Sequence, residues 1–162
     1  MEKLKISRRV VFLSLLLILF AVPSGFSAEK KQKKEKVEKA PSFPAAGIWL
    51  TQPPGKKFFD DKLTLVYFWD YTSINSIREI EILKKWGGLY YPYGFQMVWI
   101  HAPEFPFAEH RENVASAARR LKIPYPIFLD NDFKLWEAYQ VRSWPTKILV
   151  NGEGEIIDSN VG

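Results

Sequence analysis

The 162-residue sequence contains no cysteine. A protein without cysteine can form neither a disulfide framework nor a thiolate metal site. Its stability must therefore come from an ordinary hydrophobic core. The composition allows such a core, because 47% of the residues are hydrophobic and 15% are aromatic. These fractions differ from those of a disordered chain.

An excess of basic residues is also missing from most of the chain. The formal net charge is +5, but residues 40–162 carry thirteen basic and fourteen acidic residues. The basic excess lies in the first 39 residues. Residues 40–162 thus lack the excess of positive charge that binding to a phosphate backbone requires, and we predict that they do not bind nucleic acid.

The first 28 residues have the pattern of a secretory signal. MEKLKISRR is basic, and the thirteen uncharged residues that follow, VVFLSLLLILFAV, are fewer than the roughly 20 that a membrane-spanning helix needs. We predict a signal peptide over residues 1–28 and a secreted or periplasmic protein, anchored to a membrane only if the signal is not cleaved. Residues 29–46 are rich in charge, proline and alanine and predict a tether, followed by one domain over residues 47–162.

Alternating strand and helix patterns fill that domain. The apolar run LTLVYFW predicts a buried strand, and Ile74, Ile77, Ile80 and Leu83 give the next segment a helical stripe. The predicted order is strand 63–69, helix 74–86, strand 95–102, helix 109–123, strand 126–130, helix 132–140 with Asp132 as N-cap, and a hairpin over 145–158 that turns at Asn151-Gly152. This order predicts an α/β fold in which helices cover a mixed sheet.

Four motifs in this order resemble the thioredoxin fold and, more narrowly, the exported TlpA/DipZ-like thiol-disulfide (redoxin) branch. They are FWDYTSINS at residues 68–76, HAPEF at 101–105, DND at 130–132 and Trp144-Pro145. The resemblance covers about residues 47–161 and implies a thioredoxin-like three-layer sandwich, a mixed β-sheet flanked by helices. The fold normally adds a final helix after the point where this sequence ends, Gly162, so we expect either a shortened domain without that C-terminal helix or an incomplete sequence.

The resemblance implies that Ser73 and Ser76 occupy the positions of the two redox cysteines. Disulfide exchange needs a thiolate, and a serine hydroxyl cannot form a disulfide. We therefore expect no thiol-disulfide catalysis from this chain. The serines also fit a structural role, because Thr72 or Ser73 can cap the helix and Ser76 with Glu79 has the spacing of a capping box.

The resemblance further implies that Pro145 is cis, faces the former redox pair, and follows a residue whose backbone pairs with an extended substrate. With Trp69, Tyr71 and Trp144 it would form an aromatic-rimmed groove for a protein or peptide partner. For Trp69, packing in the core is an equal alternative. We predict a non-catalytic binding module. The alternative is a member of a thiol-disulfide pathway, for example in cytochrome maturation, whose CxxC is lost or engineered to SxxS.

Other chemistries are less well supported by the sequence. A serine nucleophile would need an imidazole base, and the spacing does not require either histidine, His101 or His110, to meet a serine. His101, Glu104 and His110 match no standard metal-ligand spacing. The DND motif begins like a calcium loop but has Leu135 where glycine is required. We predict no metal and no cofactor.

Overall fold

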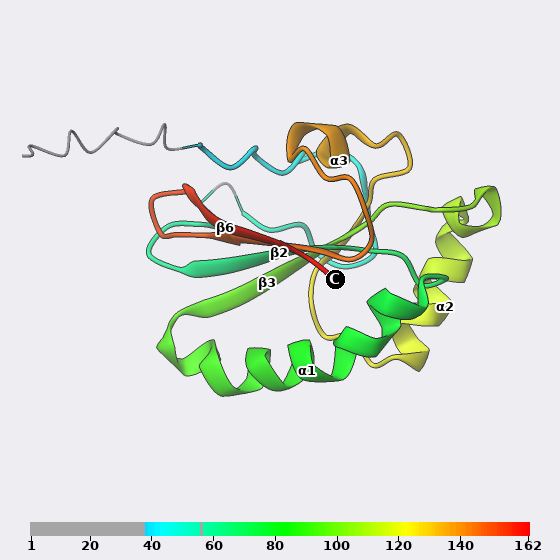
Figure 1. Cartoon of the computed structure of the whole chain (residues 1–162), viewed down its shortest axis with the longest axis horizontal. Helices are drawn as coiled ribbons and strands as arrows, with labels where there is room; N and C mark the ends of the chain where they lie inside the picture. Colours follow the sequence, from blue (N-terminus) through cyan, green and yellow to red (C-terminus); the bar gives the residue numbers. More distant parts are fainter. Residues whose placement is uncertain (1–37, 56) are drawn as a thin grey trace, which may run out of the picture. The chain divides into compact units, whose positions relative to one another are not determined.

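The computed structural model describes residues 38–55 and 57–162, so the predicted signal and the first half of the predicted tether lie outside the described residues. The elements in chain order are β1 (Ile48–Trp49), β2 (Leu63–Trp69), α1 (Ile74–Tyr90), η1 (Tyr91–Tyr93), β3 (Phe95–His101), η2 (Pro106–Glu109), α2 (Arg111–Arg120), β4 (Ile127–Leu129), α3 (Lys134–Ala138), β5 (Thr146–Val150) and β6 (Ile156–Val161). Figure 1 shows their arrangement. None of these helices is long and apolar enough to span a bilayer.

The strands form one mixed sheet in the order β1-β4-β3-β2-β5-β6. The central strands β2, β3 and β4 are parallel, and the outer strands β1, β5 and β6 pair antiparallel with their neighbours. Because β2 lies inside the sheet and is covered on both faces, six of its seven residues are buried. The prediction of a mixed sheet flanked by helices is confirmed, and β2 has the predicted bounds.

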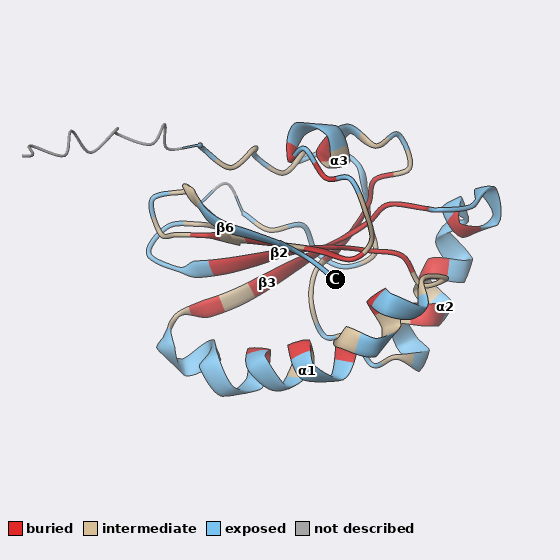
Figure 2. Cartoon of the chain, viewed as in Figure 1, coloured by how far each residue is buried: buried red, intermediate tan, exposed pale blue. Residues whose placement is uncertain are grey.

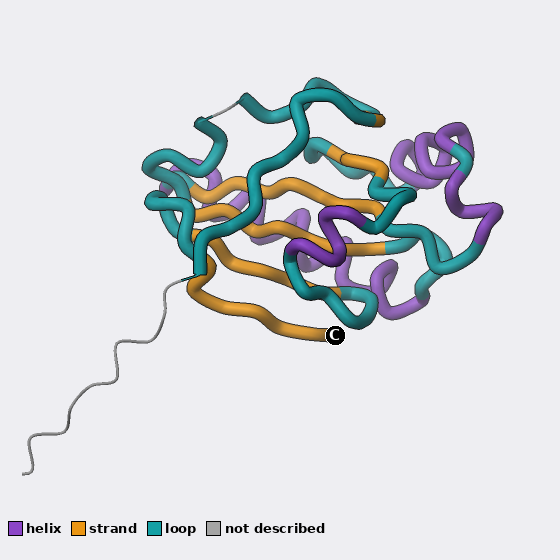
Figure 3. Tube along the Cα trace, turned by 90° about the horizontal axis from the view of Figure 1, so that it is seen from above, coloured by secondary structure: helices purple, strands orange, loops and turns teal. Residues whose placement is uncertain are grey.

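Alternate residues of the central strands face two hydrophobic cores. Val66 and Phe68 of β2 pack on the side of α3, and Tyr67 and Trp69 pack on the side of α1 and α2. Figures 1 and 3 show α1 and α2 together on one face of the sheet and α3 on the other. Figure 2 shows that the buried residues lie mainly in the strands between these layers. This layering leaves the carboxyl ends of β2 and β3 at one edge of the sheet.

The buried stripe of α1 differs from the predicted one. Ile80 and Leu83 are buried as predicted, but Ile74 is 58% exposed and Ile77 only partly buried. The buried residues of the helix are Ser76, Ile80, Leu83 and Gly87. A small polar residue and a glycine thus occupy buried positions, because the helix lies close to its neighbours at both ends. A pattern based on apolar residues alone cannot find such contacts.

Residues 38–46 belong to the folded unit, so the predicted tether does not extend to residue 46. The Ala40 amide donates to the Gly154 carbonyl at 2.9 Å, and Tyr139 donates its hydroxyl to the Pro41 carbonyl at 2.7 Å. Phe43 packs among aromatic rings, including that of Phe59 at a centroid distance of 5.4 Å. The segment covers the sheet face on the α3 side, and its apolar side chains bury there despite the proline-rich composition.

Near the carboxyl end of the chain, the predicted hairpin is confirmed and the predicted cap of the short helix is wrong. β5 and β6 pair antiparallel on either side of Asn151-Gly152. The β5–β6 connection is a five-residue loop over 151–155, in which the Asn151 side chain accepts from the amides of Glu153 and Glu155, and Gly154 adopts the positive φ. Asp132 does not cap α3. The Asp130 carboxylate does so from four residues before the helix, accepting from the amides of Leu135 and Trp136.

Candidate functional site

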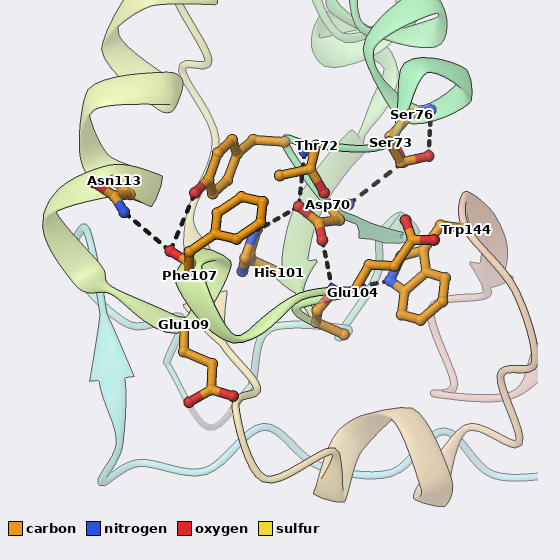
Figure 4. Close-up of polar contacts among 12 residues, drawn as sticks. Asp70, Thr72, Ser73, Ser76, His101, Glu104, Phe107, Glu109, Asn113 and Trp144 are labelled. Carbon is orange, nitrogen blue, oxygen red and sulfur yellow. Dashed lines mark hydrogen bonds and ion pairs between the residues drawn. The ribbon is translucent and has the colours of Figure 1, made fainter.

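The site lies where β2 ends and α1 begins. Ser73 is the N-cap of α1, with an extended backbone, and its Oγ accepts a hydrogen bond from the Ser76 amide at 3.4 Å. The prediction that Thr72 or Ser73 caps this helix is confirmed for Ser73. Figure 4 shows the two serines together on the first turn. The Ser73 hydroxyl thus stabilises the amides at the positive end of a 17-residue helix.

Ser76 is fully buried and forms part of the link between the helix and the strand. Its Oγ accepts from the Asp70 amide at 3.4 Å, and its carbonyl accepts from the Tyr67 hydroxyl at 3.0 Å. The predicted capping box of Ser76 and Glu79 is wrong, because Ser76 lies inside the helix and Glu79 pairs with Lys147 of β5. Burial raises the pKa of Tyr67 far above its ordinary value, so its hydroxyl stays a donor.

Asp70 organises the polar interior of the site and is completely buried. Its Oδ1 accepts from the Thr72 amide at 2.8 Å, and its Oδ2 accepts from the Glu104 amide at 2.5 Å. The His101 Nε2 atom lies 3.4 Å from Asp70 Oδ1, an electrostatic contact without hydrogen-bond geometry. Asp70 therefore ties the start of α1 to the loop that follows β3 (Figure 4).

The pKa of Asp70 reflects opposing effects. Burial raises the pKa of the carboxyl, but the contact with His101 and the amides of Glu104 and Thr72 together lower it below its ordinary value. Asp70 is consequently a carboxylate at neutral pH, and it presents negative charge to His101. The buried imidazole also stacks on Tyr71 at a centroid distance of 5.6 Å and meets Trp69 edge-on at 5.5 Å.

The loop after β3 is held in place by backbone and side-chain contacts. The Ala102 amide donates to the Trp69 carbonyl at 3.1 Å. The Phe107 carbonyl accepts from the Asn113 side chain at 2.9 Å and from the Tyr71 hydroxyl at 3.4 Å. Figure 4 shows the Asn113 side chain directed at this carbonyl. Tyr71 therefore connects the end of β2 to η2.

Trp144 and Pro145 reach the same edge of the sheet from β5. Thr146 pairs with Phe68, which places the preceding Pro145 next to the carboxyl end of β2. The Trp144–Pro145 peptide bond is cis, and the Trp144 indole donates to the Ala102 carbonyl at 2.8 Å. Within the described part of the chain, the backbone N–H and C=O of Trp144 form no hydrogen bond.

The predicted groove residues differ in exposure. Tyr71 and Trp144 are partly exposed, and Pro145 is buried. Trp69 is completely buried in the core between the sheet and the helices. Of the two alternatives for Trp69, the structure shows core packing, because its ring packs against that of Trp99 at a centroid distance of 5.4 Å. Trp69 is a core residue next to the site and does not line the surface of the site.

Sequence reasoning missed Asp70 and the structural role of Glu104. Nothing in the motif FWDYTS predicts that Asp70 would receive amides from two separate segments, since this depends on how the loop after β3 folds. An aspartate at the end of an apolar strand, three residues before a helix N-cap, was the only local signal. The sequence offers His101 as a candidate base or metal ligand, and the structure places it against Asp70.

The arrangement does not form a hydrolytic triad. Ser73 and Ser76 use their hydroxyls as acceptors for backbone amides, and among the described residues neither serine is hydrogen-bonded to a histidine. His110 is exposed at the start of α2. No group of three or more histidine, aspartate or glutamate residues in the described ranges could hold a metal ion.

Comparisons with known proteins point to one group of folds. No model of a protein family matches the sequence. The protein DipZ of Mycobacterium bovis is 35% identical over 121 residues, which cover 72% of this chain and 17% of DipZ. The thiol-disulfide oxidoreductase ResA of Bacillus cereus is 23% identical, with 100% of this chain and 91% of ResA covered. The chain thus spans about a sixth of DipZ but nearly all of ResA.

Solved structures agree with the sequence relatives. A thioredoxin-like protein in its oxidised form superposes with a TM-score of 0.70 at 19% identity, covering 78% of this chain and 85% of that one. The thioredoxin domain of a thiol-disulfide oxidoreductase from Bacteroides vulgatus gives a TM-score of 0.65 at 23% identity, covering 76% and 86%. Similarity at this level establishes the fold and not the activity.

Proposed function

We propose that this chain, which has the thioredoxin-like fold of the DsbE-, ResA- and TlpA-like thiol-disulfide oxidoreductases, is an exported module that binds a polypeptide and transfers no electrons. The absence of cysteine supports the second part of the proposal, because a hydroxyl cannot take part in disulfide exchange. The signal pattern of residues 1–28 supports export. No metal or cofactor enters the proposal.

The backbone of Trp144 carries the proposal of binding. Its N–H and C=O have no partner within the described residues, although they lie beside the sheet and next to a partly exposed aromatic side chain. Backbone groups of this kind pair with an extended peptide in the manner of an added strand. The Trp144 indole is fixed by its bond to the Ala102 carbonyl, so the surface is ordered before a partner arrives.

The site also supplies apolar surface for a partner side chain. Ile74, directly after the N-cap, is 58% exposed, and Tyr71 and Trp144 are partly exposed. The hydroxyls of Ser73 and Ser76 are occupied by backbone amides. These contacts suit a surface that recognises a chain, and they leave no activated nucleophile to cut or modify it.

Selection from a phage-displayed library of random dodecapeptides tests the proposal. Peptides enriched on the 162-residue chain should bind a Trp144→Ala variant at least about tenfold more weakly, as expected when an aromatic anchor is removed. Trp86→Ala, which alters a tryptophan at the far end of α1, is the matched control and should bind normally. Chemical shifts of ¹⁵N-labelled protein should change at the Trp144 amide.

The competing function is thiol-disulfide exchange by some other route. Insulin reduction in the presence of dithiothreitol should proceed at the background rate with this chain. Catalysis above background would refute the proposal. A library from which no peptide is enriched, or bound peptides that leave the Trp144 amide unshifted, would refute binding at this site.

A second candidate is a role in a thiol-disulfide pathway whose CxxC is lost or replaced. The similarity to ResA and DipZ favours it, and the Ser73→Cys, Ser76→Cys double variant tests it. If these serines stand at former cysteine positions, the variant should form an intramolecular disulfide and reduce insulin. Mass spectrometry with and without alkylation would measure the bond.

A further inference from the structure

The strand β6 forms one edge of the sheet and is exposed over most of its length. It pairs only with β5 in the strand order, and Figure 3 shows it as the outermost strand on its side of the sheet. Residues 157–161 are all exposed, including the apolar side chains of Ile157 and Val161, at 53% and 59%. An exposed strand edge presents N–H and C=O groups that can pair with another strand. The edge of β6 is therefore a candidate interaction surface.

The hydrogen bonds of β6 show which of its backbone groups face outward. The Gly162 amide donates to the Pro145 carbonyl at 3.0 Å, and Thr146 and Val161 form the next pair in the register. In an antiparallel ladder every second residue bonds to the neighbouring strand, and the residues between direct their N–H and C=O groups to the other side. The N–H and C=O groups of Ser159 and Val161 consequently point away from β5. No described segment beyond β6 bonds to these groups.

The start of the same edge already takes part in strand pairing. The Ile156 amide donates to the Glu38 carbonyl at 2.8 Å. Lys39 forms an isolated antiparallel bridge with Glu155. The outer edge of β6 thus accepts an antiparallel strand, and residues 38–40 cover only the beginning of this edge.

The free part of the edge lacks the features that keep exposed strands apart. Natural edge strands are commonly very short or carry lysine or proline. The opposite edge of the sheet, β1, is only two residues long. β6 has six residues, and residues 158–161 include neither lysine nor proline. This regular edge is suited to pairing with a further strand.

The β6 strand of a second copy is complementary to this edge. If the two strands pair antiparallel with Asn160 opposite Asn160, Ser159 of each copy lies opposite Val161 of the other. The outward N–H and C=O groups of Ser159 and Val161 then bond to one another across the two strands. Asp158 lies opposite Gly162, so the carboxylates of the two copies do not face each other. The edge is therefore self-complementary in its hydrogen bonds and its charge.

This pairing also brings apolar surface together. Asp158 and Asn160 line a cavity with Trp86 and Tyr90 of α1, so their side chains lie on the α1 face of the sheet. Residues directly opposite each other in an antiparallel pair have their side chains on the same face. Each cavity has its own β6 as one wall, so the cavities of both copies would lie side by side on one face of the joined sheet.

We propose that this protein forms a homodimer by antiparallel pairing of two β6 strands about Asn160. The backbone hydrogen bonds fix the register, and the apolar surface beside them adds to the association. Dimerisation does not depend on the peptide binding proposed at Trp144, because the two sites use different backbone groups. A strand of another protein is the competing occupant, and it would leave the purified chain monomeric.

Single cysteines introduced into this cysteine-free chain test the register directly. Asn160→Cys places the two thiols on Cα atoms about 4.5 Å apart, within the reach of a disulfide. Mild oxidation should link most of this variant into a covalent dimer on a non-reducing gel. Asp158→Cys is the matched control, because its two thiols would lie about 13 Å apart along the strands, and it should crosslink at least about tenfold less.

A second pair of variants tests the backbone hydrogen bonds. Ser159→Pro removes an N–H group that faces away from β5, so the ladder between β5 and β6 is retained. Ser159→Ala keeps this N–H group and is the control. In sedimentation equilibrium, Ser159→Pro should raise the dissociation constant of the dimer at least about tenfold, and Ser159→Ala should leave it unchanged.

Association through another region would crosslink Asn160→Cys and Asp158→Cys equally, and this result would overturn the proposed dimer. An unmodified chain that stays monomeric at every concentration, with no crosslinking of Asn160→Cys, would also overturn it. The edge of β6 would then be free or be occupied by a strand of another protein. Neither result affects peptide binding at Trp144, which the dodecapeptide selection tests separately.

Discussion

Two exposed regions near α1 differ in kind. At its amino end, the candidate site contains a buried carboxylate, a histidine and a network of hydrogen bonds between separate segments. At its carboxyl end, a cavity of about 600 Å³ lies between α1 and the β5–β6 side of the sheet. The cavity is lined mainly by apolar and aromatic side chains: Leu63, Leu65, Trp86, Tyr90, Tyr93, Phe95 and Leu149, with Lys147, Asp158 and Asn160.

The polar groups of the candidate site are held in fixed positions by hydrogen bonds, whereas the cavity presents mainly apolar side chains. Hydrogen bonds have direction, so the network around Asp70 fixes where each group of the site lies. The cavity is mainly apolar, and hydrophobic contacts have no preferred direction and do not specify a partner. The polar region is therefore the better candidate for specific recognition.

Removal of the Asp70 carboxylate should have the largest effect on stability. Asp70→Ala leaves the amides of Thr72 and Glu104 without an acceptor and His101 without its negative neighbour, and the free energy of unfolding should fall by about 3–5 kcal/mol. Urea denaturation measures the free energy of unfolding. Asp158→Ala at the exposed wall of the cavity is the control and should change stability by no more than about 0.5 kcal/mol. Equal effects at both positions would remove the distinction between the regions.

The helix that connects the two regions provides a second test. A Cβ at Gly87 would lie 1.9 Å from the Tyr125 hydroxyl oxygen, whereas a Cβ at Gly88 would meet nothing within 4 Å. Gly87→Ala should destabilise the protein by about 1–3 kcal/mol through overpacking. Gly88→Ala should stabilise it by about 0.5–1 kcal/mol, because alanine favours a helix. Thermal unfolding of both variants measures these changes. A higher stability for Gly87→Ala than for Gly88→Ala would contradict the packing of α1.

Loss of the helix cap should have an intermediate effect. Ser73→Ala removes the acceptor of the Ser76 amide and should lower the free energy of unfolding by about 1 kcal/mol. Ser73→Asp keeps an acceptor at the N-cap and should retain the stability of the unmodified chain. If Ser73→Ala were as stable as the parent protein, the hydroxyl would not act as a cap.

The stability of the site should depend on acid pH through Asp70. Because the pKa of Asp70 is lowered by folding, its contribution is complete above the unfolded value of about 3.9 and is lost as the pH falls through the folded value. Asp130 has a raised pKa in the folded protein because it is buried, so its contribution is lost as the pH rises from about 4. Urea titrations of Asp70→Asn and Asp130→Asn between pH 2.5 and about 7 should show opposite slopes relative to the parent.

The smallest effect is expected in the cavity. Trp86 is 39% exposed, and Trp86→Gln should change the free energy of unfolding by no more than about 1 kcal/mol. The same substitution should reduce the fluorescence of the apolar dye ANS, which binds exposed hydrophobic surface. A large loss of stability would show that the Trp86 side chain is part of the core. The cavity would then contribute to stability as the candidate site does, which would contradict the contrast between the two regions.

Sequence reasoning predicted the fold well because strand and helix patterns are local. LTLVYFW is a buried strand with the predicted bounds, and the thioredoxin-like fold is confirmed by the structural comparisons. The prediction that Ser73 or Thr72 caps α1 needed only the preference of N-caps for hydroxyl side chains. Predictions failed where a contact joined distant segments. The packing of residues 38–46 on the α3 side is one example.

The sequence by itself determined that this protein has no thiol chemistry, since a chain without cysteine has none in any conformation. It also determined the order of strands and α-helices from β2 onward, which follows from side-chain periodicity along the backbone. Only the tertiary structure decided which residues make up the site. The burial of Trp69 and the contact of Asp70 with His101 depend on how β2, the loop after β3 and the start of β5 meet at one edge of the sheet.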